Sequence, residues 1–302
     1  MSYYVTSRCP RCGNENPSDN FQCSFCGYRL RIEKIENISI FKRVEKEWIS
    51  PSPFYMKIYW LLTKPNYAFW DINHRRRDAP GFLIVFFNAI LWGLMGLAVI
   101  AHFVFTPNDA AFYYGLTFFI IFFLFGFLFN LVFYTILVWL FIKGANKTVG
   151  FSKRLESRFG EKSKIKFSES EMSPFSIYKG GTLMQKQEAN KYKMLFCAFA
   201  PFLVINAVKI LILLIALPTI EVDTTAGGVS PDTFSQTFKS PVWAVLDVMD
   251  ALTMAIWIPI LMAIGIRELS NSSTIKVLVS SFIIGIVVSI VFYFLRPTLF
   301  GF

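Results

Sequence analysis

Five long apolar stretches constrain the fold of this chain more than any other feature of its sequence. They occupy residues 82–105, 112–142, 194–217, 242–266 and 275–295. Each has at least the roughly 20 residues that an α-helix needs to cross the hydrocarbon core of a bilayer. Five such helices in 302 residues leave too little polar sequence to cover them in water. The sequence therefore predicts an all-α polytopic membrane protein with a five-helix transmembrane bundle.

The distribution of Lys and Arg predicts how these helices are oriented. Residues 106–111 contain no Lys or Arg, and 218–241 contain a single Lys against three acidic residues. The loop 143–193 contains twelve Lys and Arg residues, and Arg75, Arg76 and Arg77 stand just before the first apolar stretch. Positively charged loops stay in the cytosol. We therefore expect a multi-pass protein with a cytosolic N-terminus and an exoplasmic C-terminus.

Four of the five cysteines form two C-x-x-C pairs within the first 26 residues. Cys9 and Cys12 are followed by Gly13, and Cys23 and Cys26 by Gly27, with ten residues between the pairs. Four thiolates on two tight turns suit a closed tetrahedral site. The spacing predicts a zinc ribbon over 1–32 with one structural Zn²⁺, while a pair of redox-active dithiols is the weaker alternative.

Several arginines surround these cysteines, and two interpretations of them stay open. They can compensate the negative charge of a zinc ion with four thiolates, or they can form a docking surface. A protein contact is favoured over nucleic acid, because the module has no recognition helix and few aromatic residues for stacking. The arginines are Arg8, Arg11, Arg29 and Arg31.

Residues 33–81 are interpreted as a cytosolic linker that ends in an interfacial amphipathic segment. The stretch from Leu61 to Ile72 is aromatic and broken by Pro65, and it leads into the three arginines at 75–77. Aromatic and basic residues of this kind concentrate at membrane–water interfaces. Residues 82–302 then form the membrane domain.

Several short motifs in and before the membrane domain are similar to those of the Yip family, the Ypt/Rab-interacting membrane proteins. The matches are Thr63-Lys64-Pro65 with Ala68-Phe69 before the first span, Pro201 in the third, and Ile264-Gly265-Ile266-Arg267-Glu268-Leu269 before the fifth. The resemblance covers about 61–295 and implies a five-span, non-enzymatic protein of membrane organisation or vesicle traffic. The Asp-Leu-Tyr-Gly-Pro motif of eukaryotic members is absent.

Besides Lys276 at the start of the fifth span, three charged residues fall inside the predicted spans. Asp247 and Asp250 share one face of the fourth span, and Lys209 lies at a similar depth in the third. Charged residues in membranes are rare and generally paired or functional. An ion pair between Lys209 and Asp250 is the first interpretation. The alternatives are a Lys209 side chain that reaches the headgroups, or an ion or proton site that uses all three residues.

Two further patterns concern packing and the membrane surface. Ser281, Gly285 and Ser289 recur every four residues on the fifth span, which predicts close helix packing within the chain or in a homo-oligomer. In the loop 143–193, Lys153, Arg154 and Arg158 alternate with apolar residues. This segment is either a basic helix on an anionic membrane surface or a solvated loop.

Together these features predict a membrane scaffold or trafficking protein of the Yip type. The sequence contains only two histidines, no nucleophile with a base at motif spacing and no phosphate-binding glycine loop, so we do not expect an enzyme. Expected partners are the lipid bilayer and a cytosolic protein, with a small GTPase as one candidate, while nucleic acid is disfavoured. The alternative function is a small transporter or channel that uses Lys209, Asp247 and Asp250.

Overall fold

The predicted fold class is confirmed by the structure, a computed structural model that describes residues 6–23, 25–45, 48–106, 110–152, 154–155, 190–223, 237 and 239–299. Within these residues, five helical segments are long and apolar enough to cross a membrane. The protein is therefore an integral multi-pass membrane protein. The five segments are Arg76–Ile100, Ala111–Val149, Asn190–Ala216, Val242–Ser270 and Thr274–Phe294.

The residues fall into two compact units, to which several of the long helices contribute in turn. Unit 1 consists of Met1–Gly81, Leu137–Ala198 and Pro259–Ile284. Unit 2 consists of Phe82–Ile136, Phe199–Ile258 and Gly285–Phe302. The cysteine motifs therefore share a unit with the ends of helices that are far away in sequence.

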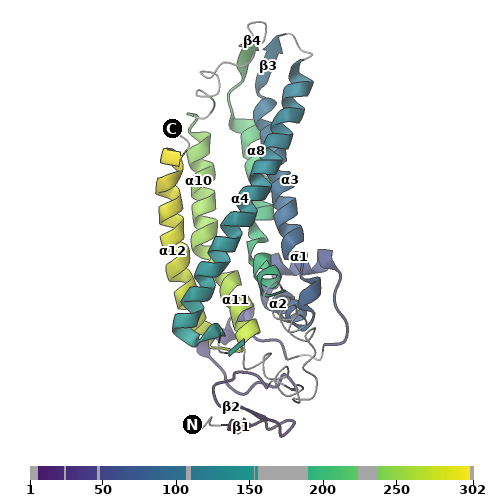
Figure 1. The fold of residues 1–302 in the computed structure, drawn as a ribbon, viewed down its shortest axis with the longest axis vertical. Helices are drawn as coiled ribbons and strands as arrows, with labels where there is room; N and C mark the ends of the chain where they lie inside the picture. The colour runs from purple at the N-terminus through teal and green to yellow at the C-terminus, as the bar shows by residue number, and fades with distance from the viewer. Residues whose placement is uncertain are drawn as a thin grey trace, which may run out of the picture. The chain divides into compact units, whose positions relative to one another are not determined.

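Unit 1 begins with a small antiparallel pair of strands, in which Ser7 faces Asn16. Short 3-10 turns and two packed helices follow (Figure 1). These elements are β1 (Thr6–Arg8), β2 (Glu15–Pro17), η1 (Lys34–Asn37), η2 (Ser39–Phe41), α1 (Phe54–Thr63), α2 (Pro65–His74) and η3 (Arg76–Asp78). Pro65 is the first residue of α2, where its missing N–H costs no hydrogen bond.

The helix α11 (Ile258–Ser270) packs closely on α2 in the same unit. Phe69 of α2 is fully buried, and a Cβ atom on Gly265 of α11 would lie 3.0 Å from its Cε1 atom. The same added atom would lie 3.2 Å from Leu195. Gly265 therefore allows three segments of the chain to approach one another here.

The remaining long helices are α3 (Gly81–Ile100), α4 (Ala110–Val149), α8 (Pro201–Ala216), α10 (Val242–Leu252) and α12 (Thr274–Leu299). Within unit 2, α3 and α4 approach each other through glycines. A Cβ atom on Gly126 of α4 would lie 2.6 Å from the Cβ atom of Trp92 on α3. Small residues at such contacts are the usual means of helix association where lipid offers no hydrophobic drive.

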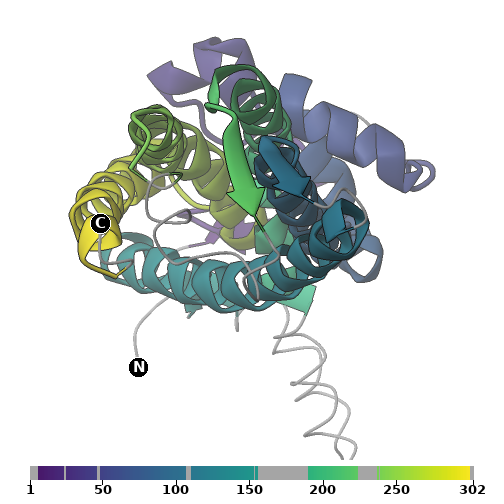
Figure 2. The same ribbon diagram turned by 90° about the horizontal axis from the view of Figure 1, so that it is seen from above.

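The end of the first predicted span is wrong, because it is a strand. The span was expected to reach residue 105, but β3 (Phe103–Thr106) pairs in parallel with β4 (Ile220–Asp223) (Figures 1 and 2). Phe103 and Phe105 are buried in an apolar cluster with Leu213 of α8. Aromatic and β-branched residues favour a strand once a partner strand satisfies their backbone groups.

The other four spans also differ from the expected ones, in their bounds or in their internal structure, and α12 extends to Leu299. The second extends to Val149, seven residues beyond the predicted end, into the predicted loop. The third begins at Asn190, before the predicted start, and is interrupted by a 3-10 turn η4 (Phe196–Phe199) ahead of α8, which starts at Pro201. The fourth contains η5 (Thr253–Trp257), a π-helical turn between α10 and α11. None of these changes alters the number of spans.

Candidate functional site

The four predicted metal ligands lie together at the start of unit 1. Their sulfur atoms all lie within 4.8 Å of one another. The Sγ atoms of Cys9 and Cys26 are 3.6 Å apart, and those of Cys12 and Cys23 are 3.7 Å apart. A tetrahedral ion with sulfur ligands at about 2.3 Å requires sulfur atoms about 3.8 Å apart. The cluster therefore has the donor set and the size of a four-thiolate metal site.

Each cysteine pair is closed by a glycine in the left-handed conformation. Gly13 has φ +73° and donates its N–H to Cys9 O at 2.8 Å, and Gly27 has φ +70° and donates to Cys23 O at 3.1 Å. Other residues are strained in this conformation, which explains why glycine follows each pair. The two turns direct both cysteines of a pair towards one point.

The thiolate form of Cys23 is favoured by its surroundings. Burial works against that form, but the backbone amides of Cys26 and Phe25 and the side chain of Asn16 donate hydrogen bonds to the sulfur. The result lowers the pKa of Cys23 to about 6. Because a thiolate is the form that binds a metal, these donors prepare the sulfur for ligation.

The cysteine module, residues 6–32, is fastened to the turn between α11 and α12. In this turn Asn271 adopts a positive φ of 51°, and its own N–H donates to Arg267 O, which ends α11. Its side chain accepts a hydrogen bond from the backbone N–H of Gln22 at 2.9 Å and donates to Gln22 O at 2.6 Å. Asn271 thus pairs with the module as a neighbouring strand would.

A buried carboxylate strengthens this attachment. Glu36 is 2% exposed and accepts hydrogen bonds from Arg29 and from Arg43, the latter at 2.8 Å. Arg43 also donates to the carbonyl of Ser272 at 2.6 Å. Burial would raise the pKa of Glu36, but the two guanidinium groups hold the pKa of this carboxyl below its usual value. The ionised form is therefore the stable one.

The N-terminus of α12 is capped by a residue from outside the helix. Glu33 accepts hydrogen bonds from the backbone N–H of Thr274 at 2.7 Å and from the hydroxyl of Ser273. A carboxylate is favourable at a helix N-terminus. Nearby, the fully buried Arg267 donates to Phe41 O. Residues 33–43, predicted to be a linker, are thus a structural joint between the cysteine module and two helices.

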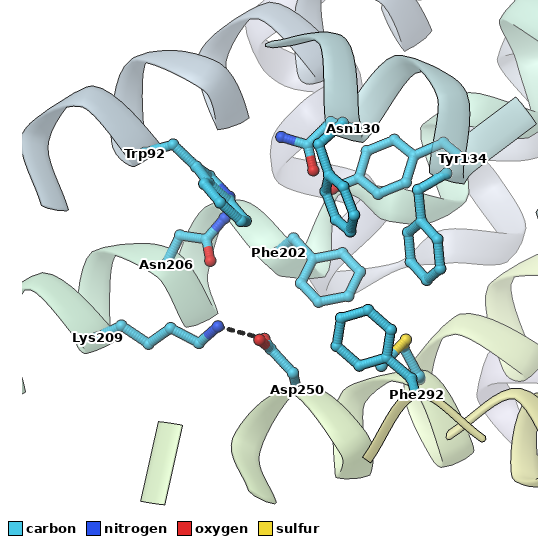
Figure 3. A pocket seen from close by; sticks show the side chains of 11 residues that line it. Trp92, Asn130, Tyr134, Phe202, Asn206, Lys209, Asp250 and Phe292 are labelled. Atoms are coloured by element: carbon cyan, nitrogen blue, oxygen red, sulfur yellow. Dashed lines mark hydrogen bonds and ion pairs between the residues drawn. The ribbon is translucent and has the colours of Figure 1, made fainter. Parts of the chain in front are cut away.

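The intramembrane charges are partly arranged as expected. Within unit 2, Lys209 of α8 and Asp250 of α10 form an ion pair (Figure 3), and both are at least nine-tenths buried. Lys209 therefore does not reach outwards. Asp247 lies one turn earlier on α10 and is half-buried, outside the small cavity at the pair.

The cavity beside the ion pair has a volume of about 30 Å³, room for one or two water molecules. Asn130, Tyr134 and Asn206 line it together with aromatic side chains (Figure 3). Asn206 also donates to Asn88 at 3.0 Å, so polar side chains link three helices of unit 2. The π-helical turn η5 begins three residues after Asp250. A neutral ion pair beside a small cavity joins two helices of unit 2.

The other predicted residues lie in several places. Ser281, Gly285 and Ser289 of α12 are all buried, and the Ser289 hydroxyl donates to Ala251 O at 2.8 Å within unit 2. Arg75 is exposed and pairs with Asp78 at 2.7 Å, and Arg76 and Arg77 follow in η3.

The basic residues of the loop 143–193 are described only in part. Arg154 forms an ion pair with Asp19 of the cysteine module in unit 1. Lys153 and Arg158 lie outside the described residues. Where it is described, this segment therefore contacts the module.

The fold and the cysteine cluster define a class: an integral multi-pass membrane protein with a cluster of four cysteines, within residues 9–26, that could hold a metal ion. No family model, no curated protein and no solved structure matches the chain.

The buried carboxylate generates a prediction for the attachment of the module. Glu36→Gln removes the charge that holds two arginines, and breaking such a buried pair typically costs about 3–5 kcal/mol. We expect faster amide hydrogen exchange in residues 20–31 of the detergent-solubilised protein. Because the pKa of Glu36 is lowered, its contribution is present above the usual glutamate pKa and is lost as the pH falls through the folded-state value.

The matched control is Glu45→Gln. Glu45 also faces Arg29, at 3.7 Å, but its side chain is 48% exposed. Exposed pairs contribute at most about 1 kcal/mol. Equal exchange in the two variants would show that Glu36 does not hold the module in place.

Proposed function

We propose that this protein is a non-enzymatic membrane scaffold that presents a zinc ribbon to partner proteins in the cytosol. The cysteine module is the ribbon, and the helical bundle fixes it to one membrane. Its role is in membrane organisation or vesicle traffic, as for the Yip family that parts of the sequence resemble.

The observation that carries this proposal is the attachment of the ribbon to the α11–α12 turn. Gln22, Glu33 and Glu36 each bond to residues of this turn or to the arginine that binds it. A module on a flexible tether would lose orientational freedom whenever it bound a partner. Fixing it beforehand removes that cost, which favours a surface built for binding.

The resemblance to the Yip family gains support from packing in unit 1. Phe69 and Gly265 belong to two of the motifs that carry it, and these residues contact each other. Pro201, from a third motif, is the first residue of α8. The motifs thus occupy positions where they shape the bundle, which is consistent with a common architecture.

The cytosolic location of the ribbon rests on charge. Arg75, Arg76 and Arg77 stand at the start of the first span, and the ribbon precedes them in the chain. The positive-inside rule places both in the cytosol. That compartment keeps thiols reduced, so four free cysteines there favour a metal over disulfides.

Zinc is the metal we propose for the cluster. Four thiolates at tetrahedral spacing suit Zn²⁺, and they leave no open coordination position for catalysis. When bound, the ion would hold the two turns at Gly13 and Gly27 together. The ribbon has little apolar core of its own, so we expect its folding to depend on the ion.

Metal analysis tests the zinc assignment. We expect one zinc per chain in the purified protein, and none after Cys9→Ser with Cys12→Ser. Cys197→Ala is the control, because Cys197 is buried in unit 1 away from the cluster and should leave the zinc content unchanged. Full zinc content in the double variant, or another metal in the native protein, would contradict the assignment.

Proximity labelling in native membranes tests the scaffold. We expect labelled partners, small GTPases or coat-like proteins among them, that disappear in the Cys9→Ser, Cys12→Ser variant while the protein stays in the membrane. The Cys197→Ala variant should retain them. If the partners are the same in all three proteins, or if only copies of the chain are recovered, the scaffold proposal is wrong.

A transporter or channel is the second candidate, and the cavity at Lys209 and Asp250 is the observation that favours it. For the scaffold, we expect Asp250→Asn to destabilise the protein by about 3–5 kcal/mol, because it leaves a buried charge unpaired. Replacing both residues, with Lys209→Met and Asp250→Leu, should restore much of the stability. A folded Asp250→Asn protein that loses proton or sodium flux in proteoliposomes would favour the transporter instead.

A further inference from the structure

The cysteine module carries an open groove that none of the functions above uses. It has a volume of about 390 Å³, within the range of ligand-binding pockets. Ser7 and Arg8 of β1 line one part of it, and Tyr28, Arg29 and Arg31 line another. The groove therefore lies between the first strand and the segment that leaves the second cysteine pair.

Apart from Pro10 and Leu30, the side chains that line the groove are basic or polar. Three of them are arginines, and none is acidic. Arg29 is neutralised by Glu36, but Arg8 faces only Glu15, at 3.7 Å in an exposed pair, and Arg31 is exposed without an acidic partner in the described part of the chain. Exposed pairs are weak. Two guanidinium groups are thus available to an incoming anion.

Among the described residues, neither Arg8 nor Arg31 donates a hydrogen bond to a cysteine sulfur, whereas Asn16 does, at 3.4 Å. Guanidinium groups match carboxylates with two parallel hydrogen bonds. The groove can therefore receive carboxylate side chains without disturbing the ligands.

The shape and polarity of the groove suit a peptide. Ser7, Ser18 and Tyr28 have hydroxyl groups that can both donate and accept hydrogen bonds, as a peptide backbone requires. In the described residues β1 pairs only with β2, so an extended chain could add to its other edge as a further strand. Ile32, next to Arg31, is 72% exposed and offers an apolar contact.

The position of the module favours a soluble partner over lipid. The module is bonded to Asn271 and Ser272, just after Ser270, the residue at which the fourth span ends. Within unit 1, β1 and β2 lie beyond the end of α11 (Figure 1). A groove in this place lies beyond the end of the spanning helix. Acidic peptides in the aqueous phase can therefore reach it.

We propose that this groove binds an extended acidic segment of a partner protein, with carboxylates on Arg8 and Arg31 and an apolar side chain near Ile32. The inference rests on the proposed function, because it specifies what the scaffold recognises. It also assigns a binding role to Arg8 and Arg31, in addition to any compensation of charge at the cysteine cluster.

The test uses the full chain, loaded with zinc, in nanodiscs of neutral lipid. The probe is a fluorescein-labelled peptide in which glutamate alternates with serine and leucine, and the same peptide with glutamine is the comparison. We expect the acidic peptide to bind in a salt-sensitive way and the glutamine peptide not to bind. Arg8→Glu with Arg31→Glu should weaken binding by about tenfold or more, since each residue is expected to make a charge-assisted contact.

The control variant carries Lys34→Glu and Lys42→Glu, which change the net charge equally at exposed positions outside the groove. It should bind as the native protein does. Equal loss in both double variants would overturn the site, because it would show a general effect of charge. Binding of phosphatidylserine vesicles or inorganic phosphate through Arg8 and Arg31 without peptide binding would overturn the choice of partner.

A second measurement keeps the inference testable if the arginine variant loses its zinc. The acidic peptide with a photoreactive group should crosslink the native protein at Ser7, Tyr28 or Arg31, and crosslinks only elsewhere would contradict the groove. If ribbon-dependent partners persist when Arg8 and Arg31 are replaced, the groove inference fails and the scaffold stands. If no partner depends on the ribbon, the scaffold itself fails.

Discussion

The buried carboxylate of Glu36 is the interaction on which the architecture of unit 1 depends. It pairs with two arginines at once, Arg29 and Arg43. Arg43 also donates a hydrogen bond to the carbonyl of Ser272. Charges removed from water are costly unless they are paired and hydrogen-bonded, so this cluster tolerates few alternative arrangements. A polar module and a lipid-embedded helix pair thereby acquire a defined relation to each other.

In unit 2, buried charges are also paired, but here the pair lies within helices that are apolar and long enough to span a membrane. Lys209 and Asp250 neutralise each other between two helices, and the amide pair Asn206–Asn88 adds a neutral hydrogen bond. In hydrocarbon no water is present to form hydrogen bonds with a polar side chain, so its partner must come from a neighbouring helix. Such contacts select one packing of helices whose outer surfaces are otherwise uniformly apolar.

What the sequence predicted, and what it missed, follows from the range of each interaction. The spans and the cysteine pairs are local patterns, because hydropathy and ligand spacing can both be recognised within a short stretch of sequence. The Lys209–Asp250 pair could be found from depth alone. The β3–β4 pairing joins Phe103 to Ile220, and the local sequence around either residue does not predict this pairing. The bonds of Gln22, Glu33 and Arg43 to residues 271–274 are equally non-local, so residues 33–43 resembled a linker. The mixture of acidic and basic residues over 29–47, between the cysteine motif and the first membrane segment, was the one available signal.

The separation of these partners in sequence has a consequence for synthesis. Arg43 and Asn271 are 228 residues apart, and the ribbon leaves the ribosome before any of the helices exists. Its four cysteines are complete by Cys26, so a metal ion could bind early, whereas the turn that attaches the module forms only when α11 and α12 have been inserted. During that interval Glu36 and its arginines are solvated and Gln22 lacks its partner. Attachment of the cysteine module therefore requires both α11 and α12, and a product that ends before α12 would carry an unattached module.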